Sequence, residues 1–138
     1  MRTISGKVSW IDILNPSKKD VDHLRSTYNF HPIILDELLV SSTHSRVESY
    51  DDYLYMTYHL PVYDPAKKTS RRAEVDFLIT RDAVITVHYE ALEPLEALEG
   101  VLNAGEEFSR RALGKNTSVL AYHIISRSYL SLCASSGT

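Results

Sequence analysis

The sequence is short of cysteine and has no long apolar segment. Its 138 residues include a single cysteine, Cys133, so no disulfide can form within the chain, as is typical of a reducing compartment. No uncharged segment approaches the roughly eighteen apolar residues that a membrane-spanning helix needs. The N-terminus also lacks the apolar stretch of a signal peptide. These absences predict a soluble domain in the cytoplasm.

The motifs of several enzyme and nucleotide-binding classes are missing as well. The chain has five glycines and contains neither a GxGxxG nor a Walker-type phosphate loop, and no GxSxG turn to present a nucleophilic serine. It contains no HExxH, CxxC or EF-hand pattern for a metal ion. The formal net charge is −3 at pH 7, so the domain as a whole has no basic surface for nucleic acid. We therefore expect neither an enzyme nor a nucleic-acid-binding protein.

The composition that is present is typical of one folded domain. Hydrophobic residues make up 43% of the chain and charged residues 24%, which excludes an intrinsically disordered protein. A chain of this length buries roughly two thirds of the surface that it exposes when unfolded. We expect a single domain over residues 1–138.

The first part of the chain predicts a strand followed by a helix. Residues 8–14 are rich in β-branched and aromatic side chains and end at an Asn-Pro pair, which predicts a strand with a firm end. Ser17 lies three residues before Asp20, as in a capping box, and valine, leucine and tyrosine follow at helical spacing. This pattern predicts a helix over residues 18–28.

The remaining elements alternate between helical and extended patterns. A second helix is predicted from Pro32 onward, and it should be largely buried because residues 33–35, 38 and 39 are apolar. Strands are predicted at residues 53–62, 73–80 and 83–90, with a turn over residues 64–72 and a two-residue link that makes the last two strands an antiparallel hairpin. Helices are predicted from Pro94, near residues 106–113, and from Ser118.

This order of elements predicts an α/β fold with a mixed parallel and antiparallel sheet. The predicted order is one strand, two helices, three strands and then helices. The final helix has no obvious element to cover its apolar residues. We therefore expect the natural chain to continue beyond Thr138.

The densest group of possible metal ligands is His31, Asp36, Glu37 and His44. Carboxylate oxygens suit Mg²⁺, whereas histidine suits zinc and its neighbours. Asp36 and Glu37 are adjacent, so on a helix they point about 100° apart and do not easily share one tight site. The spacing is equally compatible with polar residues that simply rim a buried helix.

One basic cluster stands out, formed by Lys67, Lys68, Arg71 and Arg72. Contact with nucleic acid or with anionic lipid is one interpretation. The cluster falls in the predicted turn and has no interleaved aromatic residues, which favours a solvated turn.

The order and spacing of several short motifs resemble the cytoplasmic domain of CorA-type divalent-cation transporters. The motifs are Trp10-Ile11-Asp12 followed by Asn15-Pro16, Phe30-His31-Pro32 with Leu35-Asp36-Glu37, Val47-Glu48 with Tyr50-Asp51-Asp52-Tyr53, Phe77-Leu78-Ile79-Thr80, and Val84-Ile85-Thr86-Val87-His88. The resemblance as a whole runs from about residue 8 to residue 132, nearly the whole chain.

The resemblance implies an α/β/α sandwich, a mixed sheet flanked by helices on both faces. It further implies a homopentamer at the cytoplasmic face of the membrane, anchored by a stalk helix and two membrane helices beyond this chain, with Mg²⁺ or Co²⁺ bound between neighbouring subunits to hold the pore closed. Asp36 and Glu37 fall on the acidic pair of the family's second helix, so Glu37 first and Asp36 second are the implied sensing ligands.

Some positions depart from the family pattern and leave alternatives open. Thr43-His44-Ser45 replaces the usual Gln-Arg-Pro, and Ser126 with Arg127 occupies a place where family members often carry aspartate. Because ZntB-type zinc transporters share the architecture, Zn²⁺ is an alternative ion. A stand-alone interaction domain of the same fold is an alternative function.

Overall fold

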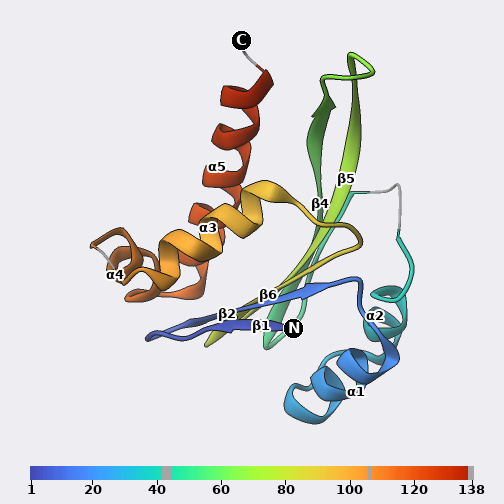
Figure 1. The fold of residues 1–138 in the computed structure, drawn as a ribbon. Helices are drawn as coiled ribbons and strands as arrows, with labels where there is room; N and C mark the ends of the chain where they lie inside the picture. The colour runs from blue at the N-terminus through green and yellow to red at the C-terminus, as the bar shows by residue number, and fades with distance from the viewer. Residues whose placement is uncertain (42–44, 106, 137–138) are drawn as a thin grey trace.

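The computed structural model describes residues 1–41, 45–105 and 107–136, and its strands form one six-stranded sheet (Figure 1). The strands are β1 (Arg2–Ile4), β2 (Ser9–Leu14), β3 (Arg46–Ser49), β4 (Tyr53–Asp64), β5 (Thr69–Thr80) and β6 (Ala83–His88), in the spatial order β1-β2-β6-β5-β4-β3. Among these described strands, β2 and β6 run parallel and the other neighbouring pairs are antiparallel. The predicted mixed sheet and the antiparallel β5–β6 hairpin are confirmed.

Helices cover both faces of the sheet (Figure 1). Helices α1 (Lys18–Thr27) and α2 (Pro32–Glu37) lie on one face, and α3 (Glu93–Asn103), α4 (Glu107–Leu113) and α5 (Thr117–Ser136) lie on the other. The core on the α2 side includes Ile13, Leu78, Ile85 and Leu35, and the core on the α3 side includes Trp10, Phe77, Val84, Leu95 and Leu120. The α/β/α sandwich is therefore confirmed. Within the described residues, no helix is both long enough and apolar enough to span a membrane.

The start of α1 follows the predicted capping box. The Ser17 hydroxyl accepts the backbone N–H of Asp20 at 3.3 Å, and the Asp20 carboxylate accepts the backbone N–H of Ser17 at 3.0 Å. The preceding strand ends where Asn15 adopts a left-handed φ of 53° before proline. These local signals are strong because each satisfies or removes a backbone N–H at the helix start.

The hairpin of β4 and β5 is longer than the sequence predicts. The strands stay paired from Tyr53 opposite Thr80 out to Asp64 opposite Thr69, so the turn comprises residues 65–68 and the prediction of a turn over residues 64–72 is wrong. β3 reaches only to Thr57, and β6 pairs β5 only up to Val75. The outer part of the hairpin therefore projects beyond β3 and β6 (Figure 1). Leu60 and Ala73 in this part are still buried in the core on the α3 side, whereas Thr69–Arg72 at the start of β5 are exposed.

Two further expectations differ from the structure. The edge strands β1 and β3 are only three and four residues long and carry charged side chains, so no apolar alternation marks them in the sequence. Helix α2 is less buried than its apolar residues suggest: Ile33 is 61% exposed and Leu39 41% exposed, whereas Ile34, Leu35 and Leu38 are buried. A six-residue helix presents one face to the sheet and leaves the other uncovered.

A buried polar network joins the parallel strands β2 and β6. Nε2 of His88 lies 2.9 Å from both carboxylate oxygens of Asp12, and Thr86 donates to Asp12 Oδ1 at 2.6 Å. The indole of Trp10 donates to the Thr86 hydroxyl at 2.8 Å. On the other side of the imidazole, Nδ1 lies 2.7 Å from the Glu90 carbonyl. Because a carboxylate and a carbonyl only accept, both ring nitrogens of His88 donate, and the imidazole is positively charged.

The ionisable groups of this network shift one another's pKa values. Burial alone would lower the pKa of His88, but the hydrogen bonds and charge of Asp12 outweigh it and raise that pKa. Burial alone would raise the pKa of Asp12, but His88 outweighs it and lowers that pKa. Glu99 of α3 lies beside Asp12 and binds Arg2 of β1 at 2.8 Å, and burial raises its pKa. The network therefore ties β1, β2, β6 and α3 together.

We predict that the Asp12–His88 pair makes folding stability depend on pH in both directions. The Asp12 contribution is present above the ordinary pKa of 3.8 and is lost as pH falls through its lowered folded value. The His88 contribution is complete below the ordinary pKa of 6.5 and is lost as pH rises through its raised folded value. Urea unfolding across pH should therefore show the greatest stability between these two ordinary values.

In the same assay, His88→Gln should cost about 3 kcal/mol near pH 6, because Asp12 is left buried without its counter-charge. The exposed His23→Gln is the matched control and should change the free energy of unfolding by less than about 0.5 kcal/mol. Equal losses in the two variants would contradict the ion pair.

Ser17→Ala should destabilise the domain by about 1 kcal/mol, because the N–H of Asp20 loses its acceptor at the start of α1. Ser26→Ala in the last turn of the same helix is the control, since its hydroxyl donates to the carbonyl of His23 at an exposed position. The difference in urea midpoint between the two variants measures the cap. Identical midpoints would show that the cap contributes nothing.

Candidate functional site

Helix α2 presents the predicted residues Asp36 and Glu37 in its last turn. Its start is fixed by His31, whose Nδ1 accepts the N–H of Ile33 at 3.2 Å and whose backbone N–H donates to the Tyr53 hydroxyl at 2.9 Å. Its buried apolar residues then hold the helix against the sheet. Both carboxylates are consequently carried to the surface at one edge of the domain.

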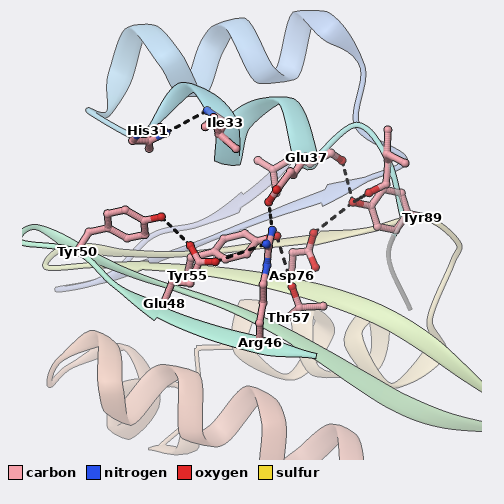
Figure 2. Close-up of polar contacts among 12 residues, drawn as sticks. His31, Ile33, Glu37, Arg46, Glu48, Tyr50, Tyr55, Thr57, Asp76 and Tyr89 are labelled. Carbon is pink, nitrogen blue, oxygen red and sulfur yellow. Dashed lines mark hydrogen bonds and ion pairs between the residues drawn. The ribbon is translucent and has the colours of Figure 1, made fainter. Parts of the chain in front are cut away.

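The two carboxylates have different surroundings. Asp36 is exposed, whereas Glu37 is half-buried and forms an ion pair with Arg46 of the edge strand β3 (Figure 2). This agrees with the expected divergence of adjacent side chains on a helix. Glu37 therefore already has a positively charged partner, and Asp36 faces solvent.

Arg46 is the central cation of this region. In addition to pairing with Glu37, its guanidinium lies 3.4 Å from the Glu48 carboxylate (Figure 2). The guanidinium carbon, Cζ, lies 5.0 Å from the centre of the Tyr55 ring. Burial alone would lower the pKa of Arg46, but Tyr55, Glu48 and Asp76 outweigh it and raise that pKa. Arg46 is thus a permanent positive charge held between two carboxylates and an aromatic face.

Glu48 is fixed from its other side by an aromatic pair. The Tyr50 hydroxyl donates to Glu48 at 2.6 Å, and this bond, with Glu48's charge, raises the pKa of Tyr50 to about 12. The Tyr50 ring stacks on Tyr53 with ring centres 4.7 Å apart. Glu48 is therefore a stationary second partner for Arg46 on the same strand.

A buried acidic group lies on the same side of the sheet. Asp76 of β5 is fully buried, its Oδ1 has no hydrogen-bond partner, and its Oδ2 lies 3.2 Å from the Tyr89 hydroxyl (Figure 2). Burial, together with the neighbouring carboxyl of Glu74, raises the pKa of Asp76 to about 8. Tyr89 also donates to the carbonyl of Leu38 at 2.8 Å, which links this pair to the end of α2.

The structure brings together only part of the predicted ligand set. His31 caps α2 at its opposite end, and His44 lies outside the described residues. Ser126 and Arg127 belong to α5 on the other face of the sheet, where Arg127 stacks on Phe108 at 4.1 Å. Within the described residues, no group of three or more histidine, cysteine, aspartate or glutamate side chains is placed to hold a metal ion.

Sequence reasoning did not find Arg46, Asp76 or Tyr89 as parts of this region. Arg46 follows a loop on a four-residue strand, so neither its pairing with Glu37 nor its stacking on Tyr55 is local in sequence. A signal does exist for Asp76, because a charged residue in the middle of an apolar strand indicates a buried polar interaction. The region groups the carboxylates of Glu37 and Glu48 around one guanidinium, and within the described residues it does not enclose a metal ion.

Comparison with known proteins places this arrangement in context. The chain is 22% identical over 105 residues to the "Putative metal ion transporter YfjQ" of Bacillus subtilis (strain 168), covering 76% of this chain and 32% of that protein. It thus spans about a third of the length of that relative.

Solved structures share the fold. The chain aligns with the complete CorA magnesium transporter of Methanocaldococcus jannaschii with a TM-score of 0.69 and 19% identity, covering 94% of this chain and 40% of that one. For the soluble domain of CorA from the same organism, the TM-score is 0.66, the identity 16% and the coverage 88% and 47%. The full-length CmaX protein gives a TM-score of 0.68 at 17% identity, with coverage of 86% and 35%.

The sequence model of the family described as "CorA-like Mg2+ transporter protein" matches residues 5–127, which include the strands β2–β6 and the helices α1–α4 in full. That match extends over the motifs on which the resemblance rested. The chain belongs to the CorA-like Mg²⁺ transporter family and has the fold of the CorA soluble domain.

Proposed function

We propose that this chain is the divalent-cation-sensing cytoplasmic domain of a membrane transporter for Mg²⁺ or Co²⁺, without catalytic activity. The observation that carries the proposal is the position of two carboxylates at the end of α2, one exposed and one already paired with a cation, in a chain whose family match covers residues 5–127. Such a group favours positive charge at the surface of the domain.

The incompleteness of the group supports sensing between copies rather than within one. Mg²⁺ prefers oxygen ligands in octahedral geometry and keeps several waters when a protein offers one or two carboxylates. Asp36 and Glu37 would supply the carboxylates of one subunit, and a neighbouring subunit would supply the remainder. Carboxylates facing each other across such an interface repel unless a dication lies between them, so ion binding stabilises the closed arrangement by mass action.

This proposal includes the assembly and its location. A homopentamer at the cytoplasmic face of the inner membrane, attached through helices that follow this domain, would place five such interfaces around the pore. Loss of the ion at low cytosolic Mg²⁺ would release the interfaces and allow conduction. The size of the response depends on how much more tightly the ion binds the closed state than the open one.

The first test is ion binding by the 138-residue chain. We expect weak, millimolar Mg²⁺ binding in an NMR titration, with the largest amide shifts at the end of α2, because one chain offers only part of the ligand set. The double variant Asp36→Asn/Glu37→Gln should weaken this binding by about tenfold, or 1.4 kcal/mol. Co²⁺ and Zn²⁺ titrations on the same samples rank the candidate ions.

The matched control removes two charges elsewhere. Glu93→Gln/Glu96→Gln lies on exposed positions of α3 and should leave Mg²⁺ binding within about twofold of the wild type, since surface charges this far away are largely screened. Binding that is tight and survives loss of both Asp36 and Glu37 carboxylates would contradict the assignment of these ligands.

The second test concerns the competition between Arg46 and the ion for Glu37. Arg46→Gln should strengthen Mg²⁺ binding by about two- to fivefold, because a partly exposed ion pair of this kind no longer has to be broken. Arg25→Gln, which removes the exposed ion pair with Asp22, is the control and should leave the affinity unchanged. An unchanged or weaker affinity in Arg46→Gln would show that Glu37 does not bind the ion.

A further inference from the structure

The Tyr89 hydroxyl has one proton and three oxygen atoms around it. Its oxygen lies 2.8 Å from the Leu38 carbonyl, 3.2 Å from Asp76 Oδ2 and 3.4 Å from the Val40 carbonyl. A carbonyl only accepts hydrogen bonds, so the short contact with Leu38 takes the hydroxyl proton. The contact with Asp76 then needs a second proton, and the carboxyl group is its one source.

The surroundings of Asp76 agree with a protonated carboxyl group. It is fully buried, and its Oδ1 has no hydrogen-bond partner, whereas a buried carboxylate ordinarily gathers several donors. The groups that face it are Glu74 on its own strand, Tyr55 and Thr57 on β4, and Tyr89 after β6, and the charge of Arg46 on β3 also acts on it. Just after α2, the carbonyls of Leu38 and Val40 contact Tyr89, and Glu37 at the end of α2 is paired with Arg46.

We propose that Asp76, Tyr89 and the Leu38 carbonyl form a proton-operated clasp, which holds the end of α2 while Asp76 is protonated and releases it when Asp76 ionises. In the closed clasp, the Asp76 carboxyl donates to the Tyr89 oxygen and the Tyr89 hydroxyl donates to Leu38. These two bonds connect β5, the segment after β6 and α2 (Figure 2).

Release requires the loss of a single proton. When the Asp76 proton leaves to solvent, the carboxylate becomes an acceptor and competes with Leu38 for the one proton of Tyr89. A hydrogen bond to a charged oxygen is roughly twice as strong as one to a neutral carbonyl, so Tyr89 turns to Asp76 and Leu38 loses its donor. The end of α2 is then held by its apolar residues and by the ion pair of Glu37 with Arg46.

The route for the proton is visible in the structure. A cleft of about 320 Å³ is lined by Glu74 and Tyr89, together with His59 and Arg72. Glu74 faces both this cleft and Asp76, so its carboxyl can pass a proton between solvent and the buried site. The pKa of about 8 for Asp76 places the transition close to neutral pH. The clasp rests on these contacts and not on ion binding, so it stands or fails independently of the proposed sensing function.

The experiment measures amide hydrogen exchange at Leu38–Val40 in the complete chain between pH 6.5 and 9.5, corrected for the intrinsic exchange rate. We expect protection to fall roughly fivefold across the ionisation of Asp76, the factor that corresponds to one lost hydrogen bond. A ¹³C titration of the Asp76 carboxyl in the wild-type protein should give the same midpoint. A carboxyl that titrates near the ordinary value of 3.8, or protection that stays constant while it titrates, overturns the proposal.

Variants separate the clasp from a general loss of structure. Asp76→Asn keeps a donor for Tyr89 and should hold protection at its low-pH level throughout the range. Tyr89→Phe should lower protection at every pH while Asp76 still titrates. Glu74→Gln should move the midpoint to lower pH, and the exposed control Asp52→Asn should leave it in place. The wild-type pH dependence persisting in Asp76→Asn would overturn the proposal.

Discussion

The buried contact between Asp12 and His88 is the constraint on which the arrangement of the chain depends. It lies across the parallel pairing of β2 with β6, two strands separated by most of the domain in sequence. Because β2 occupies an interior position of the sheet, the chain that leaves it must pass over one face before it can reach the far edge at β3. Helices α1 and α2 make that crossing, and this is why the end of α2 comes to lie beside Arg46.

The two faces of the sheet favour opposite protonation states of their buried aspartates. On the α3 face, Asp12 has a charged imidazole and a hydroxyl donor, so its carboxylate form is favoured. On the α2 face, Asp76 has a tyrosine and a second carboxyl as neighbours, while the nearby cation Arg46 is engaged by Glu37 and Glu48. The free energy of a buried carboxyl depends on such partners more than on its depth. One sheet therefore holds an ionised and a neutral aspartate at neutral pH.

Much of the fold follows from local signals in the sequence. The capping box at Ser17, the proline at the start of α2 and the apolar runs of β5 and β6 each act within a few residues, and the structure confirms the elements that they predict. The short edge strands and the outer part of the β4–β5 hairpin have no such signal, because their pairing depends on neighbours rather than on their own residues. The exposure of Ile33 and Leu39 on α2 has no local signal either, because the burial of a side chain depends on which elements pack against it.

The candidate site, like the fold, is predictable from the sequence only where its residues are close together in the chain. The sequence indicates Asp36 and Glu37 as a pair on one short helix, and the structure has them at the surface. Their role as ion ligands stays a prediction. The partner of Glu37 comes from a strand nine residues later, and the acid below the helix comes from β5, so only the packed domain brings them close to α2.

The outer part of the β4–β5 hairpin differs from the rest of the sheet because it has no third strand beside it. Its strands pair with each other beyond the reach of β3 and β6, so opening them breaks no hydrogen bond of the central strands. The tip around residues 65–68 lies beyond the buried pair Leu60 and Ala73, so local opening of the tip is separable from global unfolding. The four-residue turn at residues 65–68 is therefore a position at which a peptide tag or a fluorescent label can be inserted while the core and both helical layers stay folded.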